Sequence, residues 1–222
     1  MIKQVPKITE MMDLSKTIAA PLFEGKTYAW EVLGDIKAFI LKLGESLPKD
    51  EFYSPKEGVW IAKDATIFES AYIGSPCIID HGATLRHCAF IRESAIVGKN
   101  ATVGNSVELK NVILFDEVEV PHYNYVGDSV LGYHAHMGAG SITSNVKADR
   151  KNVVVHGETE METGLRKFGA ILGDYAEIGC NAVLNPGSVI GAHTNVYPTT
   201  GFRGVAPNNC VVKDVNCIIE KK

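Results

Sequence analysis

The chain has 222 residues, of which 45% are hydrophobic, and a formal net charge of −4, which fits one globular domain with a sizeable core. This mildly acidic balance gives no electrostatic reason to expect nucleic acid or an anionic membrane as a partner. No apolar run approaches the roughly 20 residues of a membrane span, the N-terminus lacks the apolar core of a signal peptide, and five cysteines without a CxxC spacing predict reduced thiols in the cytoplasm.

The first 55 residues are predicted to form a helical arm. Apolar residues recur there at the three-to-four-residue spacing of an amphipathic helix: Val32, Leu33, Ile36, Phe39, Ile40 and Leu43. Pro48 lies just beyond the expected end of that helix. We expect residues 1–55 to pack against the following domain or a neighbouring subunit rather than to take part in catalysis.

A six-residue repeat follows the arm. Steps of six reach nine aliphatic side chains in succession: Ile61, Ile67, Ile73, Ile79, Leu85, Ile91, Val97, Val103 and Leu109. The position four residues after each is Ala or Cys in the first seven steps, and the aliphatic pattern resumes at Leu172, Ile178, Leu184, Ile190 and Val196. A period of six fits neither an amphipathic helix nor a long surface strand. It indicates short strands joined by tight turns, three to a coil, with a β-sandwich as the competing fold.

Three segments depart from the repeat. In VPHYNYVGD, residues 120–128, Phe115 keeps the preceding aliphatic slot but Pro121 occupies the next one, so we expect the chain to bend outward there and present His122. The charged segment 146–169 is predicted to leave the solenoid as an insertion loop, of the kind that often builds a site. From about Asn209 the repeat ends, which gives a domain over 56–208 and a C-terminal tail over 209–222.

Two cations are expected to stack on neighbouring coils. Arg92 directly follows Ile91 and Lys110 directly follows Leu109, so the two lie one 18-residue coil apart. Neighbouring coils are about 4.8 Å apart, and like charges at that separation repel unless an anion lies between them. A phosphate suits the fork of an arginine and the point charge of a lysine. The alternative is a pair of solvated surface cations that splay apart.

The stretch VPHYNYVGDSVLGYHAHMGAGSITSNVKADRK resembles the acetyltransferase domain of the bifunctional bacterial enzyme that joins glucosamine-1-phosphate N-acetyltransferase to a uridylyltransferase. It also resembles related archaeal sugar-1-phosphate nucleotidylyltransferases, over about residues 59–205. The resemblance implies an all-β fold, a left-handed parallel β-helix built of hexapeptide repeats. It also implies a homotrimer, with acetyl-CoA bound between two β-helices as the co-substrate and no metal requirement.

The resemblance implies a role for each matching residue. The catalytic positions are His122, as the base, and Asn145. The substrate positions are Arg92 and Lys110 on the phosphate, Tyr125, His136 in place of an asparagine, and two alternative lysines, Lys151 and Lys167. The coenzyme positions are Ala139, Gly140, Cys180 in place of a serine, and Pro198. Arg92 and Lys110 are the same two residues that the 18-residue spacing selects.

The reaction that these residues imply is N-acetyl transfer from acetyl-CoA to the amine of a hexosamine 1-phosphate, either glucosamine-1-phosphate or galactosamine-1-phosphate, for nucleotide-sugar synthesis. A histidine with an ordinary pKa of about 6.5 suits removal of the proton from the acceptor amine. Backbone N–H groups of Gly138–Gly140 are expected to stabilise the oxyanion. Because no Gly-rich nucleotide loop occurs near the N-terminus, we expect a separate nucleotidyltransferase as the pathway partner.

Three other functions compete with this interpretation. One is a non-catalytic sugar-phosphate-binding module of the same fold, favoured by the departures at His136 and Cys180. Another is a zinc hydrolase of the carbonic anhydrase type, which needs three converging histidines. His134 and His136 are close in sequence, but His81 and His87 are expected on different faces. The last is an O-acetyltransferase or a transferase of another acyl chain.

Overall fold

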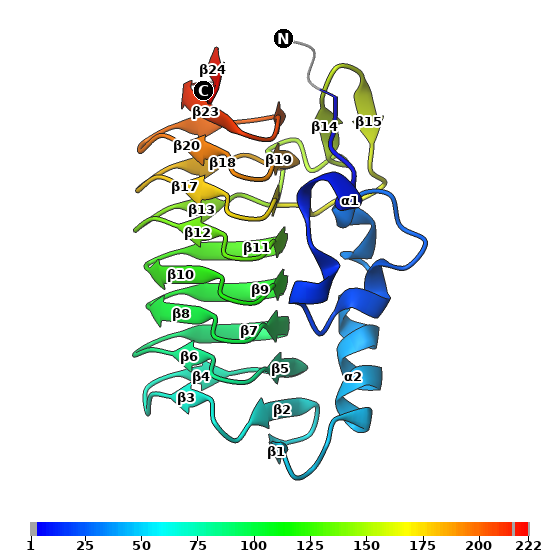
Figure 1. Ribbon diagram of the computed structural model, residues 1–222, viewed down its shortest axis with the longest axis vertical. Coiled ribbons are helices and arrows are strands. Elements are labelled where there is room, and N and C mark those ends of the chain that lie inside the picture. The colour runs from blue at the N-terminus through cyan, green and yellow to red at the C-terminus, as the bar shows by residue number, and fades with distance from the viewer. Residues whose placement is uncertain (1–3, 215, 222) are drawn as a thin grey trace.

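The computed structural model describes residues 4–214 and 216–221. It shows a parallel β-helix with a helical arm along one side (Figure 1). Each coil contributes three short strands, and corresponding strands of successive coils pair in parallel, so the stack has three faces. The predicted all-β, parallel β-helix is confirmed, whereas its left-handed sense stays a prediction from the resemblance.

The three faces are numbered here in chain order within a coil. Face 1 consists of β3 (Thr66–Ile67), β6 (Thr84–Leu85), β8 (Thr102–Asn105), β10 (Glu119–His122), β12 (His136–Met137), β17 (Glu177–Ile178), β20 (Asn195–Val196) and β23 (Cys210–Asp214). Face 2 consists of β4 (Tyr72–Ile73), the first halves of β7 (Phe90–Val97), β9 (Glu108–Leu114) and β11 (Tyr125–Leu131), then β13 (Ile142–Thr143), β18 (Val183–Leu184) and β21 (Gly201–Phe202). Face 3 consists of β2 (Val59–Ala62), β5 (Cys77–Ile79), the second halves of β7, β9 and β11, then β16 (Ala170–Leu172), β19 (Ser188–Ile190) and β22 (Val205–Ala206).

Aliphatic side chains of equivalent strands stack along the inside of the coils. On face 2, for example, Ile91 pairs with Leu109, which pairs in turn with Val126. All three are fully buried. Such columns account for the six-residue period, because each strand contributes one large inward side chain and the preceding turn leaves room only for a small one.

The coil shortens from 18 to 17 residues where β9 begins. A bulge places both Arg92 and Glu93 opposite Lys110, and from there the register advances by 17. Leu114, not Phe115, therefore fills the inward column of face 3. The side chain of Phe115 instead meets Phe23 of the arm, edge to face, with ring centroids 5.7 Å apart.

The predicted outward bend at Pro121 is wrong. Strand β10 stays in register with β8, since Val120 pairs with Val103 and His122 with Asn105. The one-residue shortening of the coil moves the inward slot from Pro121 to Val120, which is fully buried. His122 is therefore presented by the regular corner between faces 1 and 2, not by a break in the solenoid.

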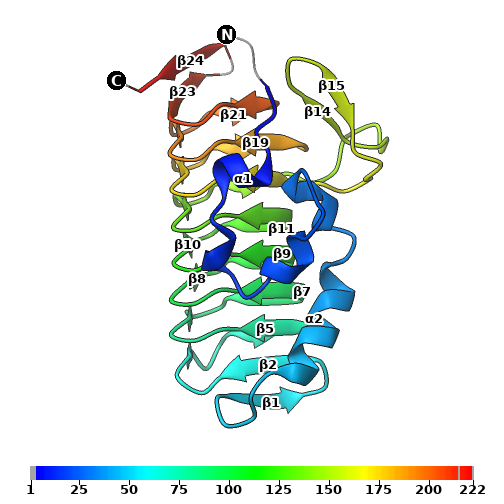
Figure 2. The same cartoon turned by 45° about the vertical axis from the view of Figure 1, so that its right-hand side comes forward.

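The arm covers the lower part of face 3 (Figure 2). It contains α1 (Ile8–Met11), three short 3-10 turns at Leu14–Lys16, Ala20–Phe23 and Ala29–Val32, and α2 (Ile36–Ser46). Helix α2 contacts β5, β7 and β9, and the third turn contacts β11. The arm thus packs on its own β-helix, where Ile36 and Ile40 are fully buried. Between α2 and the solenoid, β1 (Phe52–Lys56) pairs antiparallel with β2.

The segment 146–169 leaves the solenoid between β13 and β16 and contains a hairpin, β14 (Val154–His156) with β15 (Glu160–Glu162). Val153 and Val155 are fully buried, and the hairpin contacts β19. The C-terminal end differs from the prediction, because β23 continues face 1 beyond residue 208, with Val212 stacked on Val196. Strand β24 (Cys217–Glu220) then turns back antiparallel along β23.

Candidate functional site

One group of predicted site residues forms a ladder on the corner between faces 1 and 2. The backbone N–H that follows each rung donates to the carbonyl of the rung below it, which sets one residue per coil at this corner. The rungs are His87, Asn105, His122, Ala139, Cys180 and Pro198. The predicted base and three of the predicted coenzyme positions are therefore neighbours along one edge, and Gly140 lies beside them at the corner itself, with a φ of +71°.

A buried amide fixes the backbone around His122. Asn124 is 2% exposed and accepts the backbone N–H of His122 at 3.1 Å. Its Nδ2 donates to the carbonyl of Gly138 at 2.8 Å and to the hydroxyl of Ser141 at 3.0 Å. Because a buried amide left without partners is costly, these bonds tie the corner that presents His122 to the glycine turn of the next coil.

A second group lies on the opposite edge of face 2, at its corner with face 3. Ser94, Asn111 and Asp128 occupy this corner in successive coils with left-handed φ values of 54°, 54° and 48°. Asn and Asp tolerate that conformation better than most residues. The carboxylate of Asp128 accepts Nδ2 of Asn111 at 2.9 Å, Nζ of Lys110 at 3.3 Å, and Nδ2 of Asn145.

The two predicted phosphate cations are each paired with a carboxylate of the protein. Arg92 contacts Glu108 at 3.2 Å, and its side chain is 50% exposed. Lys110 contacts Asp128, and these two side chains are only 13% and 5% exposed. The bulge also places Glu93 as well as Arg92 opposite Lys110, so the simple one-over-one stack expected from the 18-residue spacing is not formed. The positive charge at this corner is thus balanced within the chain.

Tyr125 connects this corner to face 2. Its ring lies over the strand, because a Cβ added at Gly127 would come within 2.5 Å of the Tyr125 hydroxyl. That hydroxyl accepts Nδ2 of Asn145 at 3.2 Å. Burial, followed by the nearby carboxylates of Asp128 and Glu108, raises the pKa of Tyr125 above its ordinary value. The phenol therefore stays protonated at neutral pH and can donate a hydrogen bond.

The remaining predicted residues lie apart from these corners. His136 is on face 1, where its Nδ1 contacts Glu177 at 2.8 Å. Lys151 and Lys167 belong to the insertion, whose two ends meet at the corner, since Phe168 donates its backbone N–H to the carbonyl of Asn145. Lys167 lines a cavity next to Asn145 and Lys151 does not.

Sequence reasoning missed Asp128, Asn124 and Glu108. Asp128 follows the glycine of VGD, and Asn124 occupies the small inward slot that Val107 fills one coil earlier. A polar residue in a slot otherwise filled by small or aliphatic residues was the available signal for Asn124. The position of Glu108 one residue before the inward Leu109 gave no signal, because outward carboxylates are common on solenoid faces.

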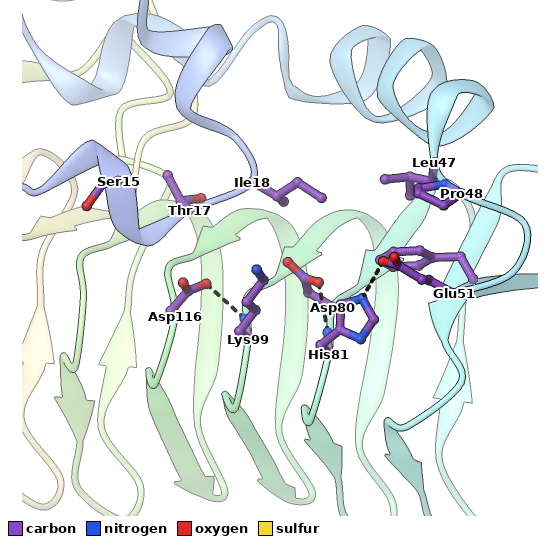
Figure 3. Close-up of a pocket in the computed structure, with 11 residues that line it drawn as sticks. Ser15, Thr17, Ile18, Leu47, Pro48, Glu51, Asp80, His81, Lys99 and Asp116 are labelled. Atoms are coloured by element: carbon purple, nitrogen blue, oxygen red, sulfur yellow. Dashed lines mark hydrogen bonds and ion pairs between the residues drawn. The ribbon is translucent and has the colours of Figure 1, made fainter.

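A separate pocket of about 240 Å³ lies between the arm and the third corner, where face 3 meets face 1 (Figure 3). Asp80 is 1% exposed, and its Oδ1 accepts the backbone N–H of His81 at 2.8 Å. Its Oδ2 has no hydrogen-bond partner among the described residues. The side chain of His81 lies between Asp64 at 2.9 Å and Glu51 at 3.2 Å. Burial raises the pKa of Asp80, and none of the predicted site residues lines this pocket.

Two searches over residues 4–214 and 216–221 were negative. No group of three or more His, Cys, Asp or Glu side chains is arranged to hold a metal ion. His134 and His136, the closely spaced pair, contact different carboxylates, Glu117 at 3.8 Å and Glu177. No helix in this part of the chain is long and apolar enough to cross a membrane.

Comparison with known proteins places the similarity in the middle of the chain. Residues 73–165 match the family described as the GMPPB C-terminal domain. A bifunctional sugar-1-phosphate nucleotidylyltransferase/acetyltransferase of Sulfurisphaera tokodaii is 37% identical over 93 residues, which are 41% of this chain and 23% of that protein. The bifunctional protein GlmU of Methanococcus maripaludis is 33% identical over 116 residues, 52% of this chain and 28% of that protein. The matched part thus spans about a quarter of the length of these relatives.

Solved structures of similar shape are more distant. A putative acetyltransferase from Bacillus cereus is 20% identical with a TM-score of 0.41, covering 72% of this chain and 76% of that one. GDP-perosamine N-acetyltransferase from Caulobacter crescentus, solved with CoA and GDP-perosamine, is 17% identical with a TM-score of 0.32, covering 73% and 55%. Scores this low carry no argument about function.

The resemblance expected from the motif around His122 is therefore confirmed over part of the chain. The relatives named above are bifunctional proteins, and the alignment covers only a minor part of each. The chain carries a β-helix segment of the hexapeptide-repeat type that resembles the GMPPB C-terminal domain and part of the bifunctional sugar-1-phosphate nucleotidylyltransferase/acetyltransferases.

Proposed function

We propose that the protein is an acetyl-CoA-dependent N-acetyltransferase whose acceptor is an amino sugar bearing phosphate, with a hexosamine 1-phosphate as the first candidate. The observation that carries the proposal is the arrangement around face 2. An exposed histidine shares one edge with the predicted coenzyme residues, and a buried polar network with a phenol donor holds the other. Acetyltransferase names among the relatives support the same reaction type.

The two edges of face 2 are suited to the two ends of such an acceptor. The strand that separates them, Tyr125–Gly127, spans roughly 10 Å at about 3.3 Å per residue. An amine held near His122 and a phosphate directed toward Arg92 bring the acceptor across the strand, where the Tyr125 hydroxyl can donate to it. Asn145, already bonded to that hydroxyl, would orient the sugar.

The proposed reaction exchanges a thioester for an amide. The acceptor nitrogen attacks the thioester carbonyl, and His122 removes the proton that the amine must lose. Collapse of the tetrahedral intermediate breaks the carbon–sulfur bond, and the proton held by the imidazole passes to the departing thiolate. The backbone around Gly138–Gly140, tied to the His122 corner by Asn124, is placed to stabilise the oxyanion.

We further propose that face 2 forms a homotrimer contact. Equivalent outward positions on this face carry Tyr72, Phe90, Ile142 and Val183, and Tyr72 and Phe90 are 58% and 39% exposed. By contrast, the outward column of face 3 is covered by the arm and the insertion, and that of face 1 begins with threonines. Exposed aromatic patches rimmed by polar residues favour association. Acetyl-CoA would then lie beside the His122 ladder between two subunits.

Release of free CoA thiol tests the proposal. The protein is incubated with acetyl-CoA and each of a set of acceptors: glucosamine-1-phosphate, galactosamine-1-phosphate, the unphosphorylated amino sugars, and amino sugars linked to nucleoside diphosphates. Thiol release that requires both an amine and a phosphate is the expected result. Binding of sugar phosphates without thiol release from any acceptor would refute the enzyme and favour the binding module.

A further inference from the structure

The insertion 146–169 builds a cavity whose polar lining is entirely cationic. The cavity has a volume of about 540 Å³ and is lined by Val146, Arg150, Arg166 and Lys167. Arg150 lies near the start of the insertion and the other two cations near its end, so the hairpin β14–β15 closes the loop that brings them together. Two arginines and one lysine around a single hollow form a concentrated positive site.

These three cations are uncompensated. Within the residues that the structure describes, none of their side chains forms an ion pair or a side-chain hydrogen bond, although neighbouring Lys147 is paired with Asp149 at 3.5 Å. All three are exposed. Coulomb repulsion among like charges that share a hollow is relieved when an anion enters it, and arginine forks match phosphate oxygens in pairs.

The contrast with the neighbouring corner locates the anion. At that corner Arg92 is paired with Glu108, and Lys110 with the nearly buried Asp128, so a phosphate placed there must compete with carboxylates already present. The insertion cavity offers three positive charges with no such competitor. It also adjoins the corner directly, because Val146 follows Asn145, whose amide contacts Tyr125 and Asp128.

We propose that Arg150, Arg166 and Lys167 form a phosphoryl-binding subsite that receives a phosphate of the acceptor. Because this subsite lies on the insertion, beyond Asn145, it suits a phosphate farther from the reacting amine than the one at Arg92, as in an acceptor that carries a diphosphate. The naming of the acceptor rests on the proposed function, whereas anion binding at the three cations does not. Coenzyme A carries phosphates too, but the predicted coenzyme residues lie on the opposite edge of face 2.

Calorimetric titration with inorganic pyrophosphate tests the subsite without any catalysis. The variants are Arg150→Ala with Arg166→Ala in one protein, and the shape-preserving Arg166→Gln alone. Lys151→Ala is the matched control, since Lys151 is an exposed cation of the same insertion that does not line the cavity. We expect the double variant to weaken pyrophosphate binding roughly tenfold or more, as for the loss of charge-assisted hydrogen bonds, and Lys151→Ala to change it less than twofold. No binding to the native protein, or equal loss in the control, would overturn the subsite.

Kinetics then identify the source of the phosphate. In the double variant we expect the KM of the phosphorylated acceptor to rise roughly tenfold, while the KM of acetyl-CoA stays unchanged. A rise confined to acetyl-CoA, absent with its 3′-dephospho analogue, would overturn the assignment to the acceptor. If no acceptor supports thiol release while pyrophosphate binding still depends on Arg150 and Arg166, the proposed function fails and the subsite stands.

Discussion

Replacement of Asp128 should destabilise the fold through one buried cation. Asp128→Ala removes the acceptor of three donors, but Asn111 keeps the carbonyl of Leu33 at 3.1 Å and Asn145 keeps the Tyr125 hydroxyl at 3.2 Å. Lys110 keeps no partner, and its side chain is only 13% exposed. Breaking a buried ion pair from one side costs about 3–5 kcal/mol. We take the lower end, about 3 kcal/mol, because Nζ still reaches some water.

Thermal unfolding followed by circular dichroism gives the measurement. At about 2–4 °C per kcal/mol for a chain of this size, Asp128→Ala should lower Tm by roughly 6–12 °C. The matched control is Glu108→Ala, whose partner Arg92 is half exposed and whose loss should cost under about 1 kcal/mol. In a Lys110→Met background the effect of Asp128→Ala should fall by about 2 kcal/mol, because no charge is left uncompensated. An equal loss in both backgrounds would refute the reasoning.

Three further predictions concern the site, the arm pocket and the assembly. Tyr125→Phe removes the hydroxyl that Asn145 contacts and should lower kcat/KM for acetyl transfer roughly threefold to tenfold, the worth of one hydrogen bond; an unchanged value would remove Tyr125 from the site. Burial raises the pKa of Asp80, so the folded state binds that proton more tightly than the unfolded chain, and stability falls as pH rises from the ordinary carboxyl pKa through the raised one. Asp80→Asn should therefore raise Tm at pH 7 relative to the native protein and lose this advantage below the ordinary carboxyl pKa, whereas a constant difference across pH would contradict the burial argument. Tyr72→Glu with Phe90→Arg should convert a trimer into monomers in light scattering coupled to size exclusion, and a native protein that is monomeric at micromolar concentration would refute the face 2 contact.

The sequence pattern predicts most of the solenoid because each inward position obeys the same packing rule. Ile61 through Leu109 need no knowledge of distant contacts, since every rung must fill the same space. The one-residue shortening at Lys110 could not be predicted in the same way. It depends on a bulge whose cost is offset by pairing across coils, and it moves the inward slots to Leu114 and Val120.

The site could be predicted only where a side chain has a role that spacing or resemblance exposes. His122 and Asn145 were found in this way, and the structure places both on edges of face 2. The pairing of Lys110 with Asp128 was not foreseeable from an 18-residue ladder, because the partner lies at a left-handed corner whose side chain turns away from the strand direction. The uncompensated cations Arg150 and Arg166 were also missed, since convergence across an insertion leaves no period in the sequence.

The central claim is that His122 removes the proton from the acceptor amine. It is tested most directly by the initial rate of CoA thiol release from acetyl-CoA with the best acceptor, comparing His122→Ala with His87→Ala. His87 occupies the same corner ladder two coils earlier and contacts Ser70. We predict that His122→Ala lowers kcat by roughly 100-fold or more, as for loss of a general base, with bound acetyl-CoA retained and the control unaffected. A rate in His122→Ala within threefold of the native enzyme would contradict the claim.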